Sequence, residues 1–144
     1  MRKQLSRKLA RVDVVADGSY RGTAVVASGQ ITLQDLASLV EVGLHYDSLG
    51  STMRPAVEGS VIEGLPRTWD SVWLRLKDSL GGTVNGQALI YPAADLDANG
   101  LFTGDRKVTG PGWSTDGRVT FEQTQPYPMT ILALFGTLSV GEKD

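Results

Sequence analysis

Tight-turn dipeptides recur at short intervals along this chain of 144 residues and constrain its fold more than any other feature. Asn-Gly and Asp-Gly favour the positive φ angles of two-residue hairpin turns, so each one predicts a reversal between antiparallel strands. Reversals this frequent leave room for many short strands and for little helix. The dipeptides are Asp17-Gly18, Asn85-Gly86, Asn99-Gly100 and Asp116-Gly117, and Gly-Gly stands at 81–82.

Apolar and polar residues alternate between most of these turns, which predicts strands with one buried face. The alternation over 71–77 would bury Val72, Leu74 and Leu76 and expose the residues between them. Further segments with this period are 12–14 and 24–26, paired across the first turn, followed by 40–46 and 118–124.

The run from Met129 to Phe135 is apolar on both faces, which predicts a central strand with a neighbour on each side. Pro126 and Pro128 cannot donate to a sheet ladder, so we expect them in the bend before this strand. Helices are expected only over 2–10 and as one turn around 33–37.

These elements together predict an all-β protein, an antiparallel β-sandwich of Greek-key type with a short basic N-terminal arm or helix. We expect the arm over residues 1–11 and a single sandwich domain over 12–144. Its longer loops should lie at 47–67 and 91–115.

The net charge of −2 hides an asymmetry along the chain. Residues 1–11 carry five basic side chains and no acidic one, whereas the remainder carries nine basic and sixteen acidic side chains. The arm could contact nucleic acid or an acidic partner, or could simply be a solvated chain end. The acidic body argues against phosphate-backbone binding as the main activity. No segment approaches the roughly 18 apolar residues of a membrane span, so no membrane insertion is expected.

Side chains suited to catalysis are scarce. The absence of cysteine excludes a thiolate nucleophile, and a single histidine, His45, excludes a His-rich metal site. His45 is expected on the surface of its strand. Pairs such as Asp95 with Asp97, or Asp13 with Asp17, could act as the general acid and base of a glycosidase, although acidic residues are common in β-rich loops. We expect no enzyme and no cofactor.

The segment from Asp95 to Gly100 matches the first half of a calcium loop, with further oxygen donors at Asp97 and Asn99. Arg106 stands where a bidentate glutamate should close the coordination shell. Asp and Asn are also the residues that turns use to bond their own backbone. A plain turn is therefore the preferred interpretation, and a small calcium-dependent hydrolase stays an alternative.

Aromatic side chains beside cations are typical of protein interfaces and of sugar-stacking platforms. Trp73 falls on the polar face of its strand next to Arg75, Trp69 and Trp113 lie near expected loops, and Tyr127 lies in the proline bend. These five are the candidate interface residues. If a second sheet or a long loop covers that face, Trp73 belongs to the core instead.

Several motifs follow one another in a family-like order. They are Ile31-Thr32-Leu33, Val42-Gly43-Leu44-His45-Tyr46, Leu74-Arg75-Leu76, Ser79-Leu80-Gly81-Gly82, Phe102-Thr103-Gly104-Asp105, Gly112-Trp113, Asp116-Gly117-Arg118-Val119 and Gln125-Pro126-Tyr127-Pro128. Over residues 12–135 this order resembles the C-terminal region of podovirus tail-nozzle proteins, also called tail tubular protein B or packaged-DNA stabilisation proteins. Members of that family are usually longer, with a large β-propeller-like body, and often have proline where His45 stands.

The resemblance implies a structural virion protein without catalytic residues, made in the host cytoplasm and built into the phage tail. Such proteins form a ring, commonly a hexamer, that contacts portal, adaptor and other tail proteins and conducts DNA during ejection, touching it without sequence specificity. The alternative is a β-sandwich module that recognises carbohydrate or a host surface through Trp69, Trp73 or Trp113.

Overall fold

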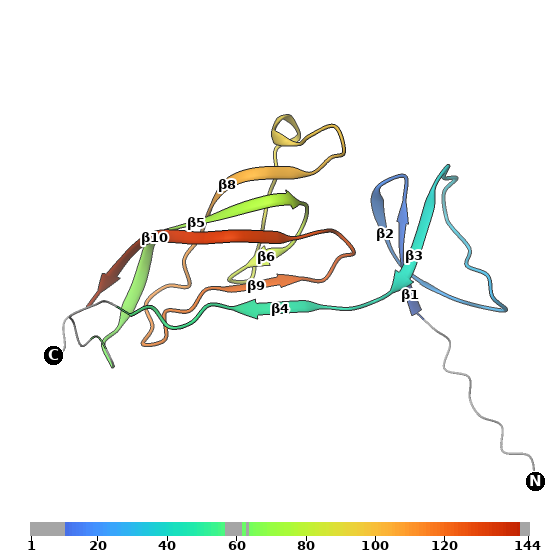
Figure 1. Ribbon diagram of the computed structural model, residues 1–144. Helices are drawn as coiled ribbons and strands as arrows, with labels where there is room; N and C mark the ends of the chain where they lie inside the picture. Colours follow the sequence, from blue (N-terminus) through green and yellow to red (C-terminus); the bar gives the residue numbers. More distant parts are fainter. Residues whose placement is uncertain (1–10, 57–61, 63, 142–144) are drawn as a thin grey trace, which may run out of the picture. The chain divides into compact units, whose positions relative to one another are not determined.

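The structure is a computed structural model that describes residues 11–56, 62 and 64–141 (Figure 1). Its residues form two compact units, the first ending at Tyr46 and the second beginning at Asp47. The fold is all-β, as predicted, and every pair of neighbouring strands is antiparallel. The expected helix over 2–10 lies outside the described residues. A single domain over 12–144 stays a prediction.

The first unit is a three-stranded sheet in the order β2-β1-β3. Its strands are β1 (Arg11–Ala16), β2 (Ser19–Val25) and β3 (Val40–Leu44). The predicted turn joins β1 to β2, with φ of 49° at Asp17 and 76° at Gly18. These left-handed angles match the twist of the two flanking strands, which is why this dipeptide closes the hairpin.

The segment between β2 and β3 contains no helix, so the turn expected at 33–37 is wrong. The Asp17 carboxylate accepts hydrogen bonds from the backbone N–H groups of Ser38, at 3.0 Å, and Leu39, at 2.9 Å. Since these amides are bound to a side chain of the neighbouring hairpin, they are not available to helical carbonyls. The segment is held to the sheet in an irregular conformation.

The second unit contains a sheet in the order β10-β5-β8. Its strands are β5 (Arg67–Ser79), β8 (Phe102–Val108) and β10 (Thr130–Val140). Two predictions fail here. The strand predicted as central, β10, is an edge strand, and β8 lies inside the expected loop over 91–115.

A second sheet in the order β4-β9-β6-β7 completes this unit. It contains β4 (Ser48–Ser51), β6 (Thr83–Val84), β7 (Gln87–Ala88) and β9 (Thr120–Gln123). The strand β4 lies inside the expected loop over 47–67. A short 3-10 helix, η1 (Ala93–Asp95), precedes β8.

Residues from both sheets and from the segments beside their strands form one core in the second unit. The predicted inward positions of β5 are fully buried, and the proline bend lies between β9 and β10, as expected. The core therefore has the two-layer arrangement of a sandwich. Its buried members are Val72, Leu74, Leu76, Val84, Leu89, Phe102 and Val119.

Candidate functional site

The outer face of the β10-β5-β8 sheet presents two aromatic side chains next to each other. Trp73 on β5 pairs with Phe135 on β10 and with Lys107 on β8. Trp73 is 36% exposed and Phe135 is 40% exposed. Trp73 therefore belongs to the surface and not to the core, because the second sheet packs against the opposite face.

An ion pair holds the cation of this face in place. Arg75 donates two hydrogen bonds to Asp105 on β8, of 2.7 and 2.8 Å, and its guanidinium lies 5.5 Å from the centroid of the Phe135 ring. The hydrogen bonds raise the pKa of Arg75 and lower the pKa of the Asp105 carboxyl. Both groups stay charged over a wide pH range. We call Trp73, Arg75, Lys107 and Phe135 the aromatic patch.

The neighbouring edge strand β10 carries no charged residue and no proline along its 11 residues. Leu132 is 58% exposed, because a register shift between Ile131 and Ala133 leaves it without a partner on β5. Among the described residues, β10 has a neighbouring strand on one side only. A long, apolar, unpaired edge is a template for pairing with another chain.

The other tryptophan of β5 has a structural role. Asp70 is the extra residue where Ser71 pairs with Thr137 and Trp69 with Leu138, and this bulge reverses the inward and outward faces of the strand. Trp69 consequently packs against the core and donates a hydrogen bond from Nε1 to the carbonyl of Gly117, at 2.8 Å.

The remaining aromatic candidates lie in loops. Trp113, between β8 and β9, is 61% exposed. Tyr127 is half-buried in the proline bend, against Gly81. The structure thus brings Trp73 and Arg75 together as the sequence predicts. It also adds two residues that were not among the candidates. Phe135 was expected in a central strand, and Lys107 was expected in a loop.

The acidic segment before β8 forms a turn through its own carboxylate. Asp97 Oδ1 accepts the backbone N–H groups of Asn99, at 2.8 Å, and Leu101, at 2.9 Å, and these bonds lower the pKa of Asp97. Asp95 lies 3.5 Å from Arg106. No group of three or more acidic or histidine side chains that could hold a metal gathers within the part of the chain that the structure describes.

The first unit contains a polar cluster that sequence reasoning missed. The buried carboxylate of Asp13 accepts a hydrogen bond from the Tyr20 hydroxyl, at 2.9 Å, and lies 2.8 Å from Nδ1 of His45. Partial burial and this bond raise the pKa of Tyr20. His45 follows β3 at the surface, as predicted. Asp13 and Asp17 bind different partners, Asp17 the backbone N–H groups of Ser38 and Leu39.

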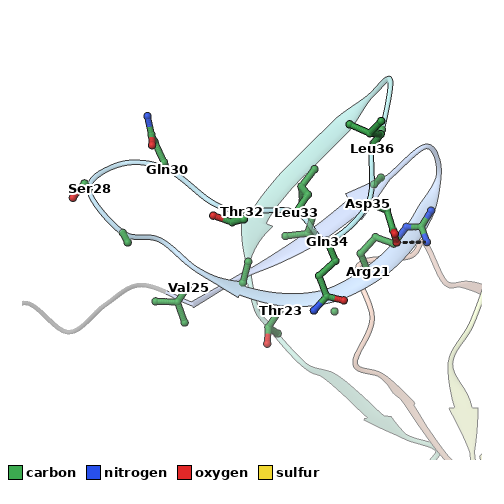
Figure 2. Close-up of a pocket in the computed structure, with 16 residues that line it drawn as sticks. Arg21, Thr23, Val25, Ser28, Gln30, Thr32, Leu33, Gln34, Asp35 and Leu36 are labelled. Atoms are coloured by element: carbon green, nitrogen blue, oxygen red, sulfur yellow. Dashed lines mark ion pairs between the residues drawn. The ribbon is translucent and has the colours of Figure 1, made fainter.

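A hollow of about 530 Å³ lies between this sheet and the segment that follows β2 (Figure 2). Val14, Ala16 and Ala24 belong to its sheet side and Leu33 to the arching segment, while Arg21 and Asp35 approach to 4.0 Å. These two are the charged side chains among its lining residues. Its lining mixes apolar side chains with polar ones, including Thr23, Gln30 and Thr32.

No protein-family model matches this chain, and no curated protein matches it either. Among the described residues, no helix combines the length and the apolar character that crossing a membrane requires.

Proposed function

We propose that this chain is a non-catalytic structural subunit of a bacteriophage tail, a nozzle-like domain that assembles into a ring. It docks onto neighbouring tail, adaptor or portal proteins in the conduit for DNA ejection. The observation that carries this proposal is the position of β10, whose eleven uncharged residues form an edge of their sheet. Monomeric proteins usually protect such an edge, so a bare one favours a subunit that pairs with another chain.

The aromatic patch supports the same function. Tryptophan and arginine are enriched among the residues that dominate binding energy in protein interfaces. Here Trp73 lies directly beside the bare edge strand, across from Phe135. An interface over this face would bury the patch and the edge together. The acidic body favours a conduit in which DNA slides, because it repels the phosphate backbone.

Native mass spectrometry and negative-stain electron microscopy of the purified chain test the proposal. Closed rings are expected, and antibodies raised against the chain should label the tail of the parent virions. Trp73→Ala should raise the dissociation constant of the ring roughly 30-fold, the effect of losing about 2 kcal/mol at an interface hot spot. Trp113→Ala, the same change in a loop outside the patch, is the matched control. A chain that stays monomeric at every concentration contradicts the proposal.

A second candidate function is recognition of carbohydrate or a host surface, favoured by the exposed ring of Trp73 beside Arg75 and Lys107. Aromatic rings flanked by hydrogen-bonding cations can stack against sugars. In that case Trp73→Ala abolishes glycan binding and leaves the oligomeric state unchanged. If Trp73→Ala breaks up the oligomeric ring, and the wild-type chain binds no glycan, the result decides for the structural function.

A further inference from the structure

The six sheet edges among the described residues differ in how they are protected. Natural edges are shielded by short length, bulges, proline or charged side chains, including charges that point inward. The edges β4 and β7 are only four and two residues long. The edge β2 carries Arg21, a left-handed Gly22 with φ of 89°, and a register shift against β1.

The edge β8 is shielded by charge. It carries Asp105, Arg106 and Lys107 in succession. The guanidinium of Arg106 lies 5.0 Å from the ring centroid of the buried Phe102, so this cation points toward the core side of the sheet. A second chain pairing with β8 would have to cover these charges.

Two edges are the least protected, and each belongs to a different unit. The strand β3 keeps a continuous register with β1 over five residue pairs, and all five of its residues are exposed. It contains one charged residue, Glu41, and no proline. The strand β10 carries no charged residue and no proline, and its one bulge, at Leu132, precedes an unbroken run over residues 133–140. Among the described residues, neither has a second neighbouring strand.

We infer that β3 of one copy pairs with β10 of a neighbouring copy, an inference that rests on the proposed self-assembly. Charge favours this pairing over two copies of the same strand. A two-fold pairing of β3 with itself, centred on Val42, places both Glu41 side chains on one face as diagonal neighbours, where they repel. Because β10 carries no charged residue, pairing β3 with β10 places no like charge beside Glu41.

Side-chain chemistry and symmetry favour the same contact. Val40, Val42 and Leu44 alternate on one face of β3, and they would continue the apolar surface of β10 across the new strand pair. Pairing β10 with itself would leave β3 bare. A contact between two different edges leaves the growing assembly with one free β3 edge and one free β10 edge, at opposite ends, so copies add head to tail until a ring closes.

Lysine substitutions test each edge separately. Leu132→Lys on β10 and Val42→Lys on β3 place a charge at an exposed position of each edge and should each convert rings to monomers in native mass spectrometry. Leu49→Lys on β4, 78% exposed and opposite Glu122, makes the same leucine-to-lysine change on a short edge and should leave the rings intact. Circular dichroism checks that all three variants keep their strands. Rings that survive both edge variants overturn the inference and leave the proposed function standing.

Cysteine cross-linking identifies the partner, because the chain has no native cysteine. One set of variants carries Glu41→Cys or Val42→Cys on β3, and the other carries Ala133→Cys, Phe135→Cys or Thr137→Cys on β10. Opposed cysteines in antiparallel strands come within disulfide range. Disulfide-linked dimers are expected only when a β3 variant is mixed with a β10 variant. Dimers from a β10 variant alone, or rings without any cross-link, overturn the inference. Monomers throughout contradict the proposed function as well.

Discussion

Replacing Arg67 with methionine should strongly destabilise the second unit. Arg67 is fully buried at the start of β5, and its guanidinium donates to the carbonyl oxygens of Pro55, at 2.9 Å, and Ile62, at 2.7 Å. These bonds tie Pro55 and Ile62 to the start of β5. Methionine keeps most of the aliphatic stem, so the variant isolates the loss of the charged donors.

The magnitude follows from the two bonds. Each hydrogen bond from a charged donor contributes about 1.5–3 kcal/mol. The Ile62 carbonyl keeps one donor in the variant, the backbone N–H of Leu65 at 3.2 Å, so the loss there is that of the charged bond alone. Removing the charge also removes its desolvation cost, which offsets part of this loss. A net destabilisation of about 2–4 kcal/mol remains, which lowers the melting temperature of a unit of about 100 residues by roughly 10–20 °C.

Thermal unfolding followed by circular dichroism measures this change. The control is Arg75→Met, which makes the same substitution on the same strand at an exposed position bonded to Asp105. It should shift the midpoint by a small fraction of the Arg67 effect, because solvent replaces its lost bonds. Equal shifts for the two variants, or a midpoint within about 2 °C of wild type for Arg67→Met, refute the reasoning from buried carbonyls.

Two further predictions concern titration. Burial raises the pKa of the Tyr91 hydroxyl from 10.0 to about 12. Its contribution to stability is therefore complete below pH 10 and is lost as the pH rises toward 12. Tyr91→Phe should remove the last phenolate transition in an absorbance titration, and an unchanged transition contradicts this assignment. The pKa of Asp97 is lowered by backbone hydrogen bonds, so its contribution is complete above the ordinary carboxyl pKa of 3.8 and is lost as the pH falls through the lower folded value. Nuclear magnetic resonance titration of the Asp97 carboxyl checks that its pKa is lowered. Adding calcium should leave the melting temperature unchanged, and a rise in the melting temperature with calcium would restore the metal-loop hypothesis.

Local sequence patterns predicted the tight turns of this protein and the alternating strands that begin or end at them. Asp17-Gly18 and Asn85-Gly86 adopt left-handed angles and close hairpins, because few other dipeptides tolerate positive φ at both positions. The alternation over β5 placed Val72, Leu74 and Leu76 in the core, because successive side chains of a strand point to opposite faces. The exposed pair of Trp73 and Arg75 follows from the same period.

The neighbours of each strand were decided by the tertiary structure. A two-residue period shows which faces are buried, but strand pairing joins residues far apart in the chain, and no local pattern encodes it. An apolar run on both faces is typical of a central strand, yet the same pattern in β10 forms an edge, so Phe135 joins the aromatic patch.

The bulge at Asp70 and the polar cluster around Asp13 also depend on strand pairing between distant residues. The bulge shifts the phase of β5 and places Trp69 against the core, although its spacing from Trp73 puts both on one face of a regular strand. Asp13 meets His45 only because β3 pairs with β1. The sequence by itself determined the tight turns and the buried face of the alternating strands, because turn angles and side-chain alternation are local, whereas β4 and β8 fall in segments expected to be loops. The tertiary structure decided which strands remain unpaired, because pairing depends on the whole chain.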